Sequence, residues 1–179
     1  GKTTDGWRGA HKDAFPEYGW VIEDGCLKVL ATGGAESKAG GDIVTVDQYG
    51  NFDLFFEFRI TEGANSGVKY FVTEAYPTAG SAIGLEYQIL DDQRHPDAKM
   101  GRDGNRTVAS LYDLIPAANK RFNGVGQWNA AHIVSLNGHV EHWLNGFKVL
   151  EYERDSDEYR RLVSESKYRV FPGLGEAEE

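Results

Sequence analysis

Short stretches in which apolar and polar residues alternate follow one another along most of the chain, separated by glycine and Asx turns. A period of two is typical of β-strands that bury one face, and an Asx-Gly pair is a strong signal for a hairpin. Such pairs stand at Asp24-Gly25 and at Asn137-Gly138. The pattern predicts strands over residues 20–23, 26–31, 42–46, 52–60, 65–72, 84–92, 108–114, 132–136, 139–144 and 147–152.

One stretch near the C-terminus has the spacing of a helix instead. Asp155 and Glu158 form a capping box, and an apolar stripe from Tyr159 to Val163 follows, which predicts a helix over residues 155–167. The 179 residues show no repeat and no boundary, and this length is usual for one all-β domain. We therefore expect a single domain over residues 1–179, an antiparallel β-sandwich with one short helix.

Polar groups recur on one face of two strands in the middle of the chain. Strand alternation places Asn65, Lys69 and Phe71 on the face opposite to Val68, Tyr70 and Val72. In the following strand Glu86 and Gln88 point away from an apolar set, which consists of Ile83, Leu85, Tyr87 and Ile89. Such a face fits the floor of a sugar-binding groove. An ordinary solvated sheet face is the alternative.

Composition and charge narrow the range of partners. The 19 basic and 28 acidic residues give a net charge of −9 without any basic cluster, which argues against nucleic acid and anionic membranes. No apolar run approaches the ~20 residues of a membrane span. Cys26 is the one cysteine, so neither an intrachain disulfide nor a cysteine metal site can form. The chain opens at Gly1 without an initiator Met, which favours a natural start upstream.

An ordered set of motifs covers most of the chain: Gly41-Asp42-Ile43-Val44-Thr45, Tyr49-Gly50-Asn51-Phe52-Asp53-Leu54, Ala64-Asn65-Ser66-Gly67-Val68, Leu85-Glu86-Tyr87-Gln88-Ile89-Leu90-Asp91, Ala109-Ser110-Leu111-Tyr112, Trp128-Asn129 and His142-Trp143-Leu144-Asn145-Gly146. In this order the motifs closely resemble the 3-keto-disaccharide hydrolase domain family. The resemblance implies a concanavalin A-like jelly roll of two curved antiparallel sheets, with carbohydrate bound on the concave face. It also implies export to the periplasm or the cell surface.

The C-terminal end departs from the family pattern. Members usually continue past the position of Glu179 with a strand of the pattern Gly-x-Ile-x-Leu-Gln-x-His-Gly, followed by a Phe-Arg-Asn-Ile strand. We therefore expect this chain to lack its closing strands, together with any site residue that they supply. An unpaired sheet edge would favour association with a second copy of the chain.

The residues present favour a particular reaction. Ordinary glycosidases need two carboxylates that flank the bond, and the Glu-x-Asp-x-x-Glu spacing of concanavalin A-like glucanases is replaced here by Glu86-x-Gln88-x-Leu90. A 3-keto sugar needs one base for its acidic C2 hydrogen, one acid for the leaving group and a donor or cation for the enolate oxygen. Water then adds across the double bond. The predicted function is hydrolysis of 3-keto-glycosides or disaccharides. A non-catalytic, lectin-like module of the same fold is the alternative.

Three residues are candidates for acid–base catalysis. Glu86 lies at a strand centre on the polar face, where a structural ion pair with Lys69 or Arg106 is the alternative. Asp91 stands where its strand leaves the sheet and has a turn role as its alternative. His95 lies in the long polar loop over residues 92–106, where an exposed histidine without function is the alternative.

Further residues are candidates for binding the sugar. They are Asn65, Lys69, Gln88, Arg106, Tyr112, His142 and Trp143. For His142, strand parity favours the core unless a bulge reverses the face. Trp143 would supply a stacking platform, with simple burial as the alternative. The sequence requires no cofactor. A divalent metal held by Asp91, His95 and Asp97 is an open alternative, although their spacing matches no EF-hand.

Overall fold

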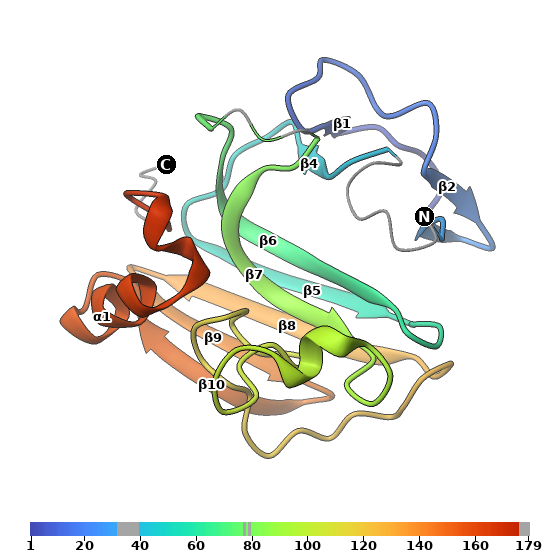
Figure 1. Ribbon diagram of the computed structural model, residues 1–179. Helices are drawn as coiled ribbons and strands as arrows, with labels where there is room; N and C mark the ends of the chain where they lie inside the picture. Colours follow the sequence, from blue (N-terminus) through green and yellow to red (C-terminus); the bar gives the residue numbers. More distant parts are fainter. Residues whose placement is uncertain (32–39, 77, 79, 176–179) are drawn as a thin grey trace. The chain divides into compact units, whose positions relative to one another are not determined.

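The alternating segments form antiparallel strands in the structure, a computed structural model that describes residues 1–31, 40–76, 78 and 80–175 (Figure 1). Contacts group these residues into two units. The first unit joins Gly1–Tyr49 with the described part of Val72–Ile83, and the second joins Gly50–Phe71 with the described chain from Gly84 onward. No helix among the described residues is both long and apolar enough to cross a membrane.

The first unit contains two small antiparallel pairs. Strand β1 (Trp7–Gly9), which the sequence pattern did not predict, pairs with β4 (Ile43–Thr45). Strands β2 (Trp20–Glu23) and β3 (Cys26–Val29) form the hairpin predicted around Asp24-Gly25. Both turn residues have positive φ, 51° and 73°, which is the conformation that a tight hairpin turn requires.

The second unit contains a four-stranded antiparallel sheet in the order β10-β9-β8-β5. Its strands are β5 (Phe52–Phe58), β8 (Asn129–Leu136), β9 (His139–Leu144) and β10 (Phe147–Glu153). Strands β6 (Asn65–Thr73) and β7 (Ile83–Leu90) pair with each other, and their adjoining ends belong to the first unit. Two 3-10 helices, η1 (Pro96–Lys99) and η2 (Lys167–Val170), and the helix α1 (Asp157–Glu165) complete the described elements.

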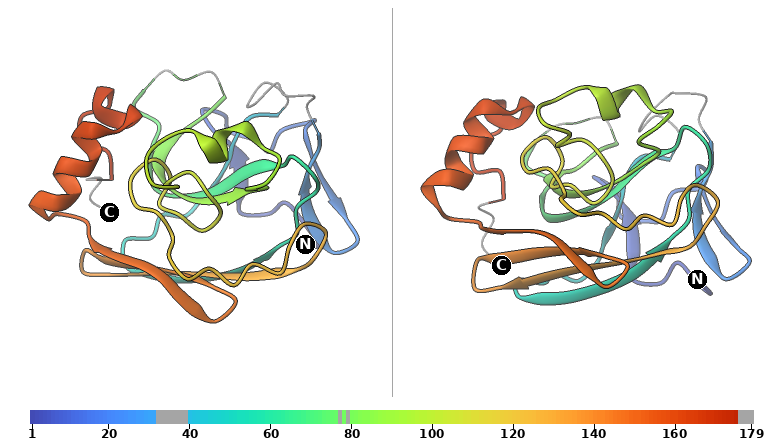
Figure 2. Two further views of the ribbon diagram at one scale, coloured as in Figure 1. Left: turned by 60° about the horizontal axis from the view of Figure 1, so that its bottom comes forward. Right: turned by 90° about the horizontal axis from the view of Figure 1, so that it is seen from below.

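The core of the second unit lies between the β6–β7 pair and the four-stranded sheet (Figure 2). The ring of Tyr87 on β7 lies 5.6 Å from Phe56 of β5 and 4.8 Å from His142 of β9, measured between centroids. Leu85 and Ile133 are also buried there. The predicted all-β class, with antiparallel sheets and one helix near the C-terminus, is confirmed.

Three local predictions are wrong. Residues 108–114 form turns with isolated bridges at Leu111 instead of a strand, because Ala109 and Asp113 have positive φ values of 66° and 62°. Helix α1 is capped by Ser156, whose Oγ accepts a hydrogen bond from the Tyr159 N–H (3.1 Å), so the predicted cap at Asp155 lies one residue too early. Phe71 has a φ of 49° and its ring contacts Phe52, so it leaves the face that strand alternation assigned to it.

Candidate functional site

Glu86 lies on β7 with its side chain directed away from the four-stranded sheet. Its neighbours Leu85 and Tyr87 are 1% and 0% exposed in the core, whereas Glu86 is half-buried. On β6, Gly67 faces the carboxylate so closely that a methyl group at this position would overlap it. Glu86 therefore lies on the polar face that the sequence pattern predicts, over a gap that only a glycine leaves open.

The other edge of β7 is closed by the turn segment over residues 109–112. Ala109 donates its N–H to the carbonyl of Gln88 (2.8 Å), and Gln88 donates to the carbonyl of Ser110 (3.1 Å). Tyr112 donates its N–H to the carbonyl of Glu86 (2.9 Å). This pairing brings Tyr112, which sequence reasoning predicted as a site residue, next to Glu86.

Arg106 binds two aspartates and orders the loop beside Tyr112. Its Nη1 donates to Asp97 Oδ1 (2.8 Å) and its Nε donates to Asp113 Oδ1 (2.6 Å). The Tyr112 hydroxyl donates to the second oxygen of Asp97 (2.7 Å). We call Asp97, Arg106, Tyr112 and Asp113 the Arg106 cluster. Because both aspartates engage its guanidinium, Arg106 holds this cluster together.

Lys167, from η2, joins the Arg106 cluster. Its backbone N–H donates to Asp113 Oδ2 (2.8 Å). Its ammonium nitrogen lies 4.1 Å from the centroid of the Tyr112 ring and 5.1 Å from that of Tyr168. The charge of Glu86 acts on all three of these side chains. A carboxylate, an ammonium group and two phenols therefore share one region of the second unit.

The surroundings set the protonation states of these groups. Desolvation raises the pKa of Tyr112, and its hydrogen bond to Asp97 raises it further. Burial would also raise the pKa of Asp97, but the hydrogen bonds from Tyr112 and Arg106 outweigh it and lower that pKa. Desolvation lowers the pKa of Lys167, against the opposing attraction of Glu86. Lys167 is therefore a cation that releases a proton more readily than an ordinary lysine.

Sequence reasoning missed Asp113, Lys167 and Tyr168. Asp113 fell inside a predicted strand, and Lys167 stood at the end of a predicted helix. Neither residue lies in a motif with Glu86, and their proximity arises only from the fold. No signal in the single sequence links η2 to β7.

Gln88 and Asn65, two of the predicted binding residues, contact each other on neighbouring strands. Gln88 is buried, and its Nε2 donates to Asn65 Oδ1 (3.3 Å) while its Oε1 accepts from the Ile89 N–H (3.2 Å). Asn65 is exposed at the start of β6, and Lys69 is half-buried further along the same strand. Gln88 therefore holds Asn65 in place from within the protein instead of facing a ligand itself.

Asp91 and His95 have structural roles in the described loop. Asp91 is buried, and its carboxylate accepts hydrogen bonds from the N–H groups of Gly63 (2.9 Å) and Gln93 (3.1 Å), as in its predicted turn alternative. His95 caps η1 by accepting from the Asp97 N–H (3.2 Å). The ligand atoms of Asp91, His95 and Asp97, the trio considered above for a divalent metal, do not converge in the structure, and Asp97 is bound instead by Arg106 and Tyr112.

His142 and Trp143 lie away from Glu86. His142 is 0% exposed, with Nε2 2.7 Å from the Tyr70 hydroxyl and Nδ1 3.0 Å from the Ala109 carbonyl. His142 is therefore the core histidine that strand parity favoured. Its prediction as a sugar-binding residue is wrong, because no part of its side chain is exposed. Trp143 lies on the outer face of the four-stranded sheet and donates to Glu141 Oε2 (2.8 Å), so it provides no platform beside Glu86.

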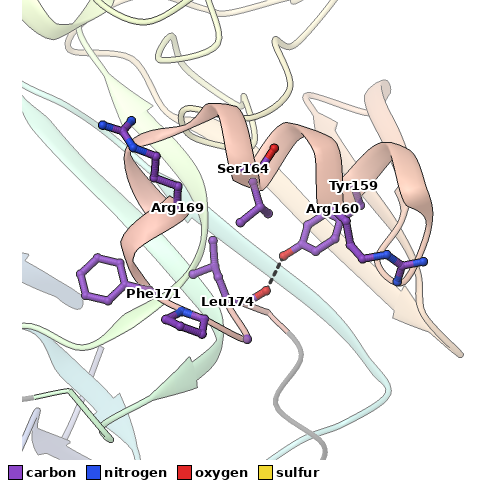
Figure 3. Close-up of a pocket in the computed structure, with 9 residues that line it drawn as sticks. Tyr159, Arg160, Ser164, Arg169, Phe171 and Leu174 are labelled. Atoms are coloured by element: carbon purple, nitrogen blue, oxygen red, sulfur yellow. Dashed lines mark hydrogen bonds between the residues drawn. The ribbon is translucent and has the colours of Figure 1, made fainter.

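A pocket lies between α1, η2 and the segment that follows (Figure 3). The Tyr159 hydroxyl crosses its base to donate to the Leu174 carbonyl (2.7 Å). No residue of the Arg106 cluster lines it, and neither does Glu86 or Lys167. The pocket is therefore separate from the candidate site.

Known proteins are similar to this chain in sequence and in fold. Residues 1–174 match the family described as the 3-keto-alpha-glucoside-1,2-lyase-like domain. A 3-keto-disaccharide hydrolase of Bacteroides thetaiotaomicron is 40% identical over 179 residues, covering 94% of this chain. The chain spans 61% of the length of that relative.

Two crystal structures from Parabacteroides distasonis ATCC 8503, both provisionally named glycosyl hydrolases, have similar folds. One has a TM-score of 0.82 at 28% identity and covers 99% of this chain and 80% of that protein. The other has a TM-score of 0.61 at 25% identity and covers 82% and 72%.

Proposed function

Because the chain belongs to the 3-keto-alpha-glucoside-1,2-lyase-like domain family, we propose that it cleaves the glycosidic bond of 3-keto-glycosides or 3-keto-disaccharides, with Glu86 as the base. The observation that carries this proposal is the half-buried Glu86 carboxylate beside Lys167 and Tyr112. The relative named as a 3-keto-disaccharide hydrolase supports the substrate class.

The proposed reaction begins with proton removal. Glu86 takes the proton from C2 of the keto sugar, and the electron pair moves onto the C3 oxygen as an enolate. When the enolate collapses, a double bond forms between C1 and C2, and the C1–O bond breaks. The leaving oxygen takes up the proton that Glu86 now carries. Water then adds across the double bond, with its hydroxyl at C1 and a proton at C2, and so regenerates a 3-keto sugar. The elimination step is common to a lyase and a hydrolase.

Lys167 suits the stabilisation of the enolate. Its ammonium lies over the ring of Tyr112 and close enough to Glu86 to interact electrostatically. A cation placed where negative charge develops stabilises the transition state more than the ground state. The Arg106 cluster holds the backbone of Lys167 through Asp113, so the lysine side chain extends from a fixed backbone position.

Product analysis tests the proposal directly. Incubation with 3-keto-trehalose and with trehalose should release sugar from the ketone substrate alone, because only the ketone acidifies C2. In D₂O the released 3-keto sugar should carry deuterium at C2. Equal cleavage of both substrates would contradict the mechanism. Binding without any product would instead identify a lectin-like module.

Replacement of Glu86 separates catalysis from binding. Glu86→Gln keeps the shape that fits over Gly67 but cannot accept a proton, so turnover should fall about 10²–10⁴-fold with ligand affinity nearly unchanged. Glu57→Gln, on the exposed outer face of β5, removes the same charge and should leave turnover unchanged. Turnover within a few-fold of wild type in Glu86→Gln would show that Glu86 only binds.

The family resemblance also motivates a proposed location in the periplasm or at the cell surface. Fractionation of the producing cell, followed by immunodetection, tests this location. Detection in the cytoplasmic fraction alone would contradict it.

A further inference from the structure

A second polar cluster lies on the outer face of the four-stranded sheet, opposite to the core. His139 and Glu141 stand two residues apart on β9, so both side chains project from the same face, whereas Val140 between them is fully buried. On β10, Glu151 pairs directly with Glu141, and Glu153 pairs with His139. The strand register therefore places one imidazole and three carboxylates together.

The ligand atoms of three of these residues converge. One ligand atom each from His139, Glu141 and Glu151 lies within 4.8 Å of the other two. His139 Nε2 is 3.6 Å from Glu141 Oε1 and 3.6 Å from Glu151 Oε2. Ligands of a tetrahedral Zn²⁺ lie roughly 3.3–3.6 Å from one another, as metal–ligand distances of about 2.0–2.2 Å require. Two of the three separations thus already fit a bound ion.

The orientation of His139 points to the same use. Its Nδ1 lies 2.7 Å from Glu153 Oε1, which directs Nε2 at the other two carboxylates. A metal-binding histidine ordinarily donates its second ring nitrogen to a carboxylate in this way, because the contact selects the tautomer and raises the basicity of the ligand nitrogen. Glu153 therefore presets His139 as a ligand without joining the ligand set.

The strand pairing also creates a demand for positive charge. Glu141 and Glu151 stand directly opposite each other on neighbouring strands, and like charges in that position repel. In the structure Lys148 supplies this charge, because its Nζ lies 3.1 Å from Glu141 Oε1 and 2.6 Å from Glu151 Oε2. Lys148 is partly exposed beside a β-bulge, so its side chain can turn outward.

We propose that His139, Glu141 and Glu151 bind a divalent transition-metal ion, with Zn²⁺ as the fitting case, and that Lys148 competes with the ion for the two carboxylates. One nitrogen and two oxygen ligands match the preference of Zn²⁺ and leave a fourth position for water. Mg²⁺ and Ca²⁺, which prefer oxygen ligands alone, should bind poorly. The site lies on the face opposite to Glu86 and is independent of glycoside chemistry.

Calorimetric titration of untagged, chelator-treated protein with ZnCl₂ tests the proposal. Wild type should bind one ion per chain and gain thermal stability. His139→Gln should weaken binding on the order of tenfold or more, since it removes the nitrogen ligand. Lys148→Met should strengthen binding several-fold, since the competing ammonium is lost. His132→Gln is the matched control, because His132 lies on the same face beside Asp53 and should leave binding unchanged.

Several outcomes would overturn the proposal. They are the absence of saturable binding by wild type, binding in Lys148→Met alone, and equal affinity in His139→Gln and wild type. Melting curves without metal establish that each variant is folded. The fluorescence of Trp143 gives a second readout, because its indole N–H donates to Glu141 (2.8 Å) and should respond when that carboxylate takes up the ion.

Discussion

Mild acid should destabilise the fold through His142, the histidine buried between the two layers of the second unit. Burial lowers its pKa to about 4, although the hydrogen bond to the Ala109 carbonyl opposes this shift. In the unfolded chain a histidine titrates near 6.5. Between these two values the unfolded state binds a proton that the folded state rejects, so the free energy of unfolding falls as the pH falls.

The magnitude follows from the two pKa values. Each unit of pKa difference corresponds to about 1.4 kcal/mol, so the full separation is worth about 3 kcal/mol. Between pH 7 and pH 5, before most carboxylates titrate, about 2 kcal/mol of this should be lost. Urea unfolding at a series of pH values measures that loss.

Two variants decide whether His142 is the cause. His142→Gln can accept from Tyr70 and donate to the Ala109 carbonyl but does not titrate, so its stability should lose this dependence on pH. His139→Gln is the control. Carboxylates, with Glu153 first, raise the pKa of His139, and its contribution is therefore fully present below the unfolded pKa and lost as the pH rises. The control should lose at least as much stability toward pH 5 as wild type. An unchanged slope in His142→Gln would refute the reasoning.

Three further changes test the candidate site. Gly67→Ala should displace the Glu86 carboxylate and cost about 10²-fold in turnover on 3-keto-trehalose without unfolding the protein; wild-type turnover would contradict the close approach. Tyr112→Phe removes the hydrogen bond to Asp97 and should lower the free energy of unfolding, measured with urea at neutral pH, by about 1–2 kcal/mol. The pKa of Asp97 is lowered in the fold, so this loss of stability should shrink as the pH falls below the pKa that Asp97 has in the unfolded chain. A loss that stays constant with pH would contradict the role of the Tyr112–Asp97 hydrogen bond. Trp143→Ala should leave kcat/KM within a few-fold of wild type, and a larger fall would place the sugar on the other face.

The strand pattern could be predicted because its causes are local. The buried Leu85 and Tyr87 alternate with Glu86 and Gln88, and the predicted hairpins turn at Asx-Gly pairs. Parity alone also placed Glu86 outside the core and His142 inside it. The same logic failed at residues 108–114 and at Phe71, where positive φ values interrupt the alternation. An apolar run does not reveal such a backbone conformation.

The candidate site could be predicted only in part, because most of its partners meet through tertiary contacts. Glu86 and Tyr112 were found from strand position and from motif. Lys167 and Asp113 were not, since nothing near them in the sequence indicates proximity to β7. Arg106 was predicted as a sugar-binding residue or an ion-pair partner of Glu86, but the two aspartates that bind its guanidinium became evident only in the fold.

The turn segment beside β7 gives an independent reason to regard the Glu86 face as functional. A regular strand over residues 108–114 would pair along the edge of β7. The direction of the Asp113 side chain would then be set by strand alternation alone. Instead the chain adopts positive φ at Ala109, at a cost of about 1–2 kcal/mol, and at Asp113, where an aspartate adopts this conformation more easily. This strain turns the backbone so that Asp113 reaches both Arg106 and the N–H of Lys167. Backbone strain that brings polar groups together in this way is common at functional sites, and it therefore agrees with the proposed role of the Glu86 face.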